Sequence, residues 1–254
     1  MRTLYQFPLS HYCEKARWLL DHKALDFTAH NLMPGVHRAF AQLKTGQNSL
    51  PILKDGEHWI ADSTQIALYL DEVYPEHALL RLDPILREKA LQINSIANEL
   101  GLHVRRWGLA MTLGISDEPI EIMIGEQGYL RKFEKISKPF LKVLLNKSYQ
   151  LNAEKVAASK EAMDAIIVQL NQMLIANHCR YLVGDRLGLA DIAVCSMLAP
   201  LLELNGTPWE NENSTAQSTE FLAYKNELLN LPLGQYVQRI YIAERNARVD
   251  WRGI

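Results

Sequence analysis

Short apolar runs recur through the first 75 residues of the chain and predict β-strands. Each run is rich in residues that favour extended backbone, and each ends near a proline, a glycine or a polar residue. Four runs fit this description: 2–8, 26–32, 49–53 and 58–61. Residues 54–57 join the last two runs, and their Asp55-Gly56 pair predicts a hairpin.

Helical spacing fills the gaps between the predicted strands. Ser10 suits a helix N-cap, and Cys13, Ala16 and Leu20 follow it at the spacing of one helical face. A shorter helix is predicted over 36–44, after a proline and a glycine and before another glycine. The chain therefore opens with a strand, a turn and a helix.

A third helix completes the first part of the chain. Asp62 and Ser63 suit its start, and Pro75 would end it. The resulting order is β-α-β-α-β-β-α, in which the crossover helix makes the first half of the sheet parallel and the hairpin makes the second half antiparallel. This order predicts a thioredoxin-like domain over residues 1–78.

Beyond residue 75 the strand pattern ends and long helical patterns replace it. The Asp83-Pro84 pair is a favourable helix start, because proline is tolerated at the first helical position. Apolar residues then recur at intervals of three and four from Leu86 to Trp107. We therefore predict an all-helical second domain over residues 84–254, after a linker near 75–83.

The later helices of this second domain are also visible in the pattern. They are predicted near 153–176, 192–204 and 233–245, with a loop over 206–220. The 192–204 run is apolar on all sides, which indicates a buried central helix with a bend at Pro200. An α/β domain followed by an all-α domain is the predicted fold class.

Composition narrows the possible functions. A net charge of -2 and a pI near 6.5 argue against a general nucleic-acid binder, which needs a basic surface. We find no uncharged apolar run of about 18 residues and no signal-peptide pattern, so membrane association is not expected. The three cysteines are few and odd in number, which fits a reducing compartment. These features predict a cytoplasmic enzyme or binding protein.

The histidines give no sign of a metal site. The eight histidines are scattered without the spacing of metal ligands, so no metal is expected. His11 follows directly after Ser10, and we expect its side chain to face solvent.

Three motifs in three parts of the chain carry a family resemblance. The motifs are LSHYCEKAR (9–17), SLPIL (49–53) with ADSTQIALYLDEVYP (61–75), and YLVGDRLGLADIAV (181–194). In this order they resemble the cytosolic glutathione transferases over the whole chain. The S-x-x-C form of the first motif looks most like the serine-type, theta-like classes. The resemblance implies a glutathione-transferase-type helical domain after the thioredoxin-like domain, and a homodimer.

The resemblance implies that Ser10 is the catalytic residue and contacts glutathione. The thiolate of glutathione is the reactive form, because the thiol is a poor nucleophile. A hydroxyl at a helix N-terminus can donate a hydrogen bond to that sulfur, and the helix dipole favours the anion. The alternative is that Ser10 is only an N-cap.

The other glutathione-binding residues are implied at two further positions. Pro51 stands where the family has a cis-proline, which would let the main chain of Leu50 pair with the cysteinyl part of glutathione. Asp62 and Ser63 match the acidic residue and serine that hold the γ-glutamyl ammonium and carboxylate groups. The alternatives are an ordinary trans proline and a pair that only caps the helix.

The chain departs from the family pattern before Leu50. The family usually offers Lys or Gln just ahead of its Val/Ile-Pro pair, whereas this chain has Asn-Ser. The group that holds the glycyl carboxylate of glutathione is therefore open, and Lys44, Gln47 and His37 are candidates. A second departure is Gly188, where the family places Ser or Thr to form a capping box with Asp191. We expect Gly188 to cap through its backbone alone.

The helical domain is also extended, through about residues 112–150. Within the extension, 129–147 contains six basic residues and one glutamate, with apolar residues between them. A membrane-surface or acidic-partner helix is one interpretation. We favour a solvated helix face that also walls the pocket of the second substrate, partly because Pro139 interrupts the pattern.

Three functions follow from these observations. The leading prediction is a glutathione transferase that conjugates the glutathione thiolate, as co-substrate, to a small hydrophobic electrophile, a detoxification reaction. A second is a thiol–disulfide or dehydroascorbate-type reductase that uses Cys13, whose place in the first helical turn would lower its pKa. However, Cys13 occupies the place of the resolving cysteine, which favours a buried structural role. A third is a non-catalytic binding protein of the same fold.

Overall fold

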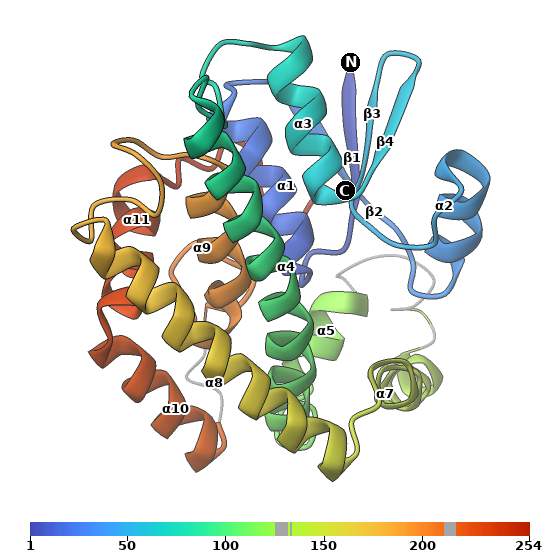
Figure 1. Cartoon of the computed structure of the whole chain (residues 1–254). Coiled ribbons are helices and arrows are strands. Elements are labelled where there is room, and N and C mark those ends of the chain that lie inside the picture. Colours follow the sequence, from blue (N-terminus) through green and yellow to red (C-terminus); the bar gives the residue numbers. More distant parts are fainter. Residues whose placement is uncertain (125–131, 133, 211–216) are drawn as a thin grey trace.

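The computed structural model describes residues 1–124, 132, 134–210 and 217–254. A small mixed sheet lies on one side of the molecule, and the later helices form a bundle beside it (Figure 1). The thioredoxin-like domain followed by a helical domain is therefore confirmed as the fold class.

The sheet has four strands in the order β2-β1-β3-β4. Its strands are β1 (Arg2–Gln6), β2 (Phe27–Asn31), β3 (Ile52–Asp55) and β4 (His58–Ala61). Strand β1 is parallel to β2 and antiparallel to β3, and β3 is antiparallel to β4. The predicted change from parallel to antiparallel pairing is confirmed.

Three strand boundaries differ from the prediction. Strand β1 stops before residue 8, because the chain turns there and Ser10 N donates to Phe7 O at 3.1 Å. Strand β3 begins after Pro51, which has no N–H to donate to a neighbouring strand. The hairpin turn is only two residues long, because Asp55 already pairs with His58.

Helices cover both faces of the sheet. Helices α1 (His11–His22) and α3 (Ser63–Val73) pack on the face that carries Leu4 and Leu53. Helix α2 (Val36–Thr45) covers the opposite face, where Ala41 meets the side chains of Ile52 and Ala61. Neighbouring strand residues therefore point to different layers, as the alternation of side chains along a strand requires.

Seven further helices are described after the sheet. They are α4 (Pro84–Thr112), α5 (Glu118–Ile124), α7 (Glu134–Tyr149), α8 (Ala153–Ala176), α9 (Leu189–Leu202), α10 (Thr219–Asn230) and α11 (Pro232–Glu244). Helix α9 is buried over nearly its whole length, which confirms the interpretation of its all-apolar sequence. It packs against α4, α10 and α11 and also against α1 of the sheet domain.

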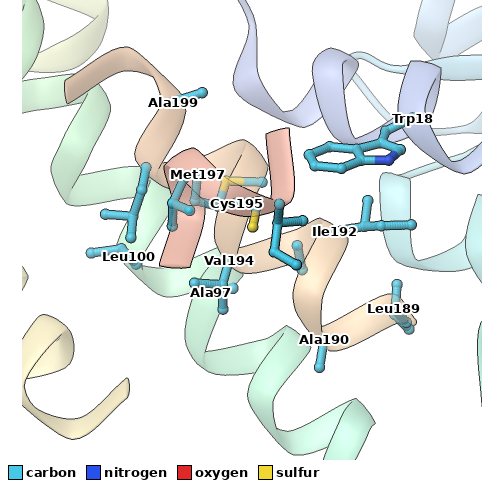
Figure 2. Close-up of a cluster of buried hydrophobic side chains, with 14 of the residues drawn as sticks. Trp18, Ala97, Leu100, Leu189, Ala190, Ile192, Val194, Cys195, Met197 and Ala199 are labelled. Atoms are coloured by element: carbon cyan, nitrogen blue, oxygen red, sulfur yellow. The ribbon is translucent and has the colours of Figure 1, made fainter. Parts of the chain in front are cut away.

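Figure 2 shows how the two halves of the protein share one apolar core. Trp18 of α1 reaches toward Ile192 and Cys195 of α9, while Ala97 and Leu100 of α4 lie along the other side of α9. All five side chains are at most 1% exposed. The shared core extends across both halves of the chain. The predicted domain boundaries, 1–78 and 84–254, therefore stay a prediction.

The extension of the helical domain differs from the prediction at Pro139. Helix α7 continues through Pro139, although a proline removes one hydrogen bond of the helix ladder. Its residues Leu141 and Leu145 are buried with Ile120 and Ile124 of α5, and this packing holds the helix on the far side of the proline. Residues 129–131 and 133 of the predicted basic segment lie outside the described residues.

Two helices were not predicted at all. Helix α5 is only seven residues long, and α10 follows a segment whose polar sequence predicted a loop up to residue 220. Ser218 caps α10 by accepting a hydrogen bond from Phe221 N at 3.0 Å, so the capping signal was present in the sequence. Residues 211–216 of the predicted loop lie outside the described residues.

Asp191 holds the start of α9 despite the glycine at position 188. Its two carboxylate oxygens accept hydrogen bonds from Leu182 N at 2.7 Å, Gly188 N at 2.9 Å and Tyr236 Oη at 2.5 Å. The aspartate half of the capping box is therefore complete, and Gly188 contributes no side-chain bond. Burial raises the pKa of Asp191 to about 6 against these hydrogen bonds.

We expect Asp191→Ala to lower the free energy of unfolding by about 2–4 kcal/mol, because two buried N–H groups would lose their acceptor. Urea denaturation followed by circular dichroism measures this loss. Asp185→Ala is the matched control, since the Asp185 side chain is 85% exposed; we expect a change within about 0.5 kcal/mol. Equal losses in the two variants would contradict a structural role for Asp191.

The C-terminal segment returns to the sheet domain. Asn31 N donates to Ile254 O at 2.8 Å, and Ile254 N donates to Ala29 O at 2.9 Å. The end of the chain therefore covers the outer edge of β2, and Figure 1 places the C-terminus beside the strands. Arg245 begins this segment and forms ion pairs of 2.7 Å with both Glu14 and Asp21 of α1.

Candidate functional site

Ser10 lies at the N-terminus of α1, where its side chain caps the helix. It is partly exposed, has extended backbone (φ -91°, ψ 117°) and accepts a hydrogen bond from Cys13 N at 3.4 Å. A serine hydroxyl has one donor and two acceptor positions. The cap uses an acceptor position, so the O–H remains able to donate to an anion beside the helix end.

A buried arginine fixes the turn that precedes Ser10. The guanidinium group of Arg17 is inaccessible to solvent and donates to Pro8 O at 3.3 Å. It also forms an ion pair of 2.8 Å with Glu14 and donates to the side chain of Gln6. The position of Ser10 is therefore set by groups on β1, α1 and the connecting turn.

Cys13 is fully buried in the first turns of α1. Its sulfur accepts a hydrogen bond from Phe7 N at 3.4 Å, and its exposure is 0%. Burial raises the pKa of the Cys13 thiol, although Ser10 and Phe7 oppose this effect. This thiol is closed to solvent and is kept in its protonated form.

The peptide bond between Leu50 and Pro51 is cis, as the resemblance implied. Pro51 O accepts a hydrogen bond from Asp62 N at 3.3 Å, which ties this turn to the start of α3. Within the described part of the chain, the main-chain N–H and C=O of Leu50 form no hydrogen bond. Both groups are therefore available to pair with an extended peptide.

The start of α3 has an unusual backbone and an unsatisfied hydroxyl. Asp62 has φ 74°, and its Oδ1 accepts from Thr64 N at 2.7 Å and Gln65 N at 3.2 Å. A non-glycine residue in this region costs about 1–3 kcal/mol and is concentrated at functional sites. Ser63 is 1% exposed, and its Oγ has no hydrogen-bond partner among the described residues. This hydroxyl is therefore able to form a hydrogen bond with a ligand at the start of α3.

The candidates for the glycyl carboxylate are spread around α2. His37 packs against Phe7, the residue just after β1, with ring centroids 4.6 Å apart. Its Nδ1 accepts from Gly35 N at 3.1 Å, so in this tautomer the proton is on Nε2. Lys44 is exposed and its Nζ lies 5.0 Å from the ring centre of Trp59. Gln47 is exposed after the helix.

His11 is buried rather than solvent-facing, so this prediction was wrong. It is 2% exposed and packs against Gly101 of α4, where a Cβ would lie 2.9 Å from its Nε2. Burial, followed by the nearby charge of Arg105, lowers the pKa of His11 to about 3. Tyr12 also faces α4, and its hydroxyl donates to Asn98 O at 2.6 Å. The helical spacing of α1 could not show that a glycine of α4 admits these rings.

A pocket opens beside the residue that precedes Ser10. Its cavity volume is about 90 Å³, and it is open to solvent. Its lining is mostly apolar and aromatic: Leu9, Met111, Pro119, Ile122, Pro200, Pro208, Trp209 and Phe221. Glu203 and Glu210 add carboxylates at the wall. The extension contributes to this wall through α5, whereas no described residue of α7 lines the pocket.

Two basic residues of α7 form ion pairs with α5 and with the residue just before it. Lys138 forms an ion pair with Glu121, and Lys142 forms one of 2.5 Å with Asp117. Over the described ranges, no helix is long and apolar enough to cross a membrane. No cluster of three His, Cys, Asp or Glu side chains suited to a metal ion occurs in the same ranges.

Comparison with known proteins decides the family. Residues 4–78 match the model of the glutathione S-transferase N-terminal domain, and residues 122–232 match the model of its C-terminal domain. The chain belongs to the glutathione transferase family. Glutathione S-transferase 1 from Dianthus caryophyllus is 28% identical over 192 residues, which cover 74% of this chain and 72% of that protein.

Several solved structures share the fold of this chain. A glutathione S-transferase from Methylobacterium radiotolerans, in complex with glutathione sulfonate, is 16% identical with a TM-score of 0.57, and 92% of each chain is covered. The beta-etherase LigF from Sphingobium is 19% identical with a TM-score of 0.58, covering 94% of this chain and 98% of that one. FzlA from C. crescentus is 19% identical with a TM-score of 0.54, and the match covers 93% of this chain and 91% of that one. These identities support a common fold and leave the reaction of this member open.

Proposed function

We propose that this family member binds glutathione at the start of α3 and conjugates its thiolate to a small hydrophobic electrophile. The observation that carries the proposal is the buried, unpartnered Oγ of Ser63, next to the positive-φ cap Asp62. A helix N-terminus with a free hydroxyl suits the γ-glutamyl carboxylate, and the Asp62 carboxylate suits the ammonium group. The unpaired main chain of Leu50, before Pro51, suits the cysteinyl part.

Ser10 is the proposed catalytic residue. Its hydroxyl donates to the glutathione sulfur and, with the positive end of α1, favours the thiolate over the thiol. The thiolate then forms a bond to an electrophilic carbon, while that carbon's leaving group departs with its electron pair. His37 and Lys44 are the proposed contacts of the glycyl carboxylate, and Gln47 is a third candidate.

The electrophile is proposed to bind in the pocket beside Leu9. Leu9 lines this pocket and precedes Ser10 in the chain, so the pocket and the thiolate site are adjacent. Proline, methionine and aromatic side chains suit a small apolar molecule. We further propose a homodimer in the cytoplasm with a role in detoxification, built from domains at residues 1–78 and 84–254.

The two other functions receive less support from the geometry. A reductase working through Cys13 needs an accessible thiolate, whereas this sulfur is fully buried and its pKa is raised. A non-catalytic protein needs no free donor at Ser10 and no pocket beside it. The hydroxyl of Ser10 and the pocket beside Leu9 are adjacent, which favours a transferase.

Ser63→Ala tests the glutathione site directly. We expect glutathione to bind about 10- to 100-fold more weakly, because a hydrogen bond to a charged group contributes about 1.5–3 kcal/mol. Titration calorimetry measures the affinity. Ser196→Ala on α9 is the matched control, because Ser196 is also buried with an unpartnered hydroxyl, and we expect no loss. Wild-type affinity in Ser63→Ala would exclude this site, and no binding at millimolar glutathione would exclude the proposed function.

A further inference from the structure

Helix α1 and its C-cap bury five acidic or basic side chains in addition to His11. They are Glu14, Lys15, Arg17, Asp21 and Lys23, each at most 7% exposed. Four of them have a partner of opposite charge: Glu14 and Arg17 pair with each other, Asp21 pairs with Arg245, and Lys23 pairs with Asp71 at 2.5 Å. Lys15 is the exception, because its ammonium group forms no ion pair within the described part of the chain.

Neutral oxygens surround the Lys15 amino group. Its Nζ lies 2.6 Å from Asn94 Oδ1, 3.1 Å from Asn98 Oδ1 and 3.4 Å from Thr64 Oγ1, all within hydrogen-bond reach. The residue is 0% exposed. A buried charge without a counter-charge is costly, even when hydrogen bonds satisfy its donors.

Lys15 lies directly behind the proposed γ-glutamyl site. Thr64, which Lys15 contacts, follows the orphaned Ser63, and its N–H donates to the carboxylate of Asp62. Asn94 and Asn98 of α4 also donate to Thr64 Oγ1, at 3.1 and 3.0 Å. The three elements α1, α3 and α4 therefore meet at one polar cluster that touches the first turn of α3.

Among the titratable groups discussed around this cluster, Lys15 is the one whose pKa lies near neutral pH. Burial lowers the pKa of Lys15 to about 7, against the opposing effect of Asp62. From α4 it faces only neutral amides. On α1 itself, burial raises the pKa of Tyr12 to about 12 and lowers that of His11 to about 3, so both stay neutral.

We propose that Lys15 is a positioning residue for glutathione. The side-chain amine of Lys15 takes up a proton from solvent when the γ-glutamyl carboxylate binds at the N-terminus of α3. The inference rests on the proposed function and adds a residue to its site. Lys15 forms no ion pair with a described residue, and the arriving carboxylate adds a second negative charge to that of Asp62, so binding and protonation favour each other. The affinity for glutathione therefore rises as the pH falls from about 9 toward 6.

The test is titration calorimetry with S-methylglutathione, whose sulfur carries no ionisable proton. Measuring the heat in buffers of different ionisation enthalpy gives the number of protons taken up on binding. We expect fractional proton uptake by the wild type between pH 7 and 8.5. Lys15→Arg keeps the charge at every pH, so it should take up fewer protons than the wild type, and only the share of the ligand's own α-amino group should remain. Lys15→Met should bind about tenfold more weakly at pH 6.5, the difference that one pKa unit produces.

Three outcomes separate this inference from the proposed function. If the wild type binds S-methylglutathione without proton uptake, the role of Lys15 is overturned whether or not its variants fold. If Lys15→Arg takes up as many protons as the wild type, the proton belongs to another group, such as His37, and the role is again overturned. If the wild type does not bind S-methylglutathione, the proposed function itself is wrong.

Discussion

Replacing Ser10 with Ala is expected to lower kcat/KM for glutathione conjugation by about 100- to 1,000-fold, the usual effect of removing one donor to a catalytic anion. The proposed role of the hydroxyl is to donate to the glutathione sulfur, while the ligand itself is held mainly at α3 and Leu50. The affinity for glutathione should therefore change little. The ultraviolet absorbance of bound thiolate at neutral pH should disappear, which calorimetry and difference spectroscopy measure together.

Two controls separate donation from helix capping. Ser10→Ala also removes the bond to Cys13 N, and losing an N-cap costs about 1 kcal/mol of stability. Ser10→Asp restores a cap acceptor but has no O–H, so we expect it to be as inactive as Ser10→Ala with the stability recovered. Cys13→Ser should retain activity. Full activity in Ser10→Ala, with activity lost in Cys13→Ser, would favour the reductase instead.

Arg245→Ala is expected to lower the free energy of unfolding by about 3–5 kcal/mol, the range for removing one partner of a buried ion pair. The Arg245 side chain is 8% exposed and pairs with Glu14 and Asp21, which are 3% and 1% exposed. Its removal would leave the Asp21 carboxylate without its ion-pair partner and would leave Glu14 with Arg17 alone. Urea denaturation at pH 7 measures the loss.

The pH dependence and a neighbouring residue provide the controls for this prediction. Burial alone would raise the pKa of Glu14, but Arg245 and Arg17 lower it to about 2 from its usual 4.5. The stability that this pairing contributes is present above about pH 4.5 and is lost as the pH falls toward 2, so the deficit of Arg245→Ala should shrink in acid. Arg248→Ala breaks a pair with Asp26, whose side chain is 91% exposed, and should cost less than about 1 kcal/mol. Similar losses of stability in Arg245→Ala and Arg248→Ala would contradict a special structural role for the buried Arg245 ion pairs.

The sequence alone determined the order of the elements and most of the residues at their ends. Strand and helix patterns are local, because side chains repeat every two residues in a strand and every 3.6 in a helix. Caps are local as well, so Ser10, Asp62 and Asp83 were identified as helix starts before any tertiary contact was known. The all-apolar run from residue 192 was interpreted as a buried central helix for the same reason.

Tertiary structure alone decided which polar side chains are buried. Glu14, Lys15 and Arg17 are charged residues of α1, and nothing in the local sequence shows that they are buried. Distant segments cover them: α4 covers Lys15, and Arg245 of the C-terminal segment reaches Glu14 across 231 residues of sequence. A buried charge is stable only where distant segments supply its partners. A local pattern cannot show those partners, which is why the Lys15 cluster, the buried His11 and the Arg245 ion pairs emerged only from the fold.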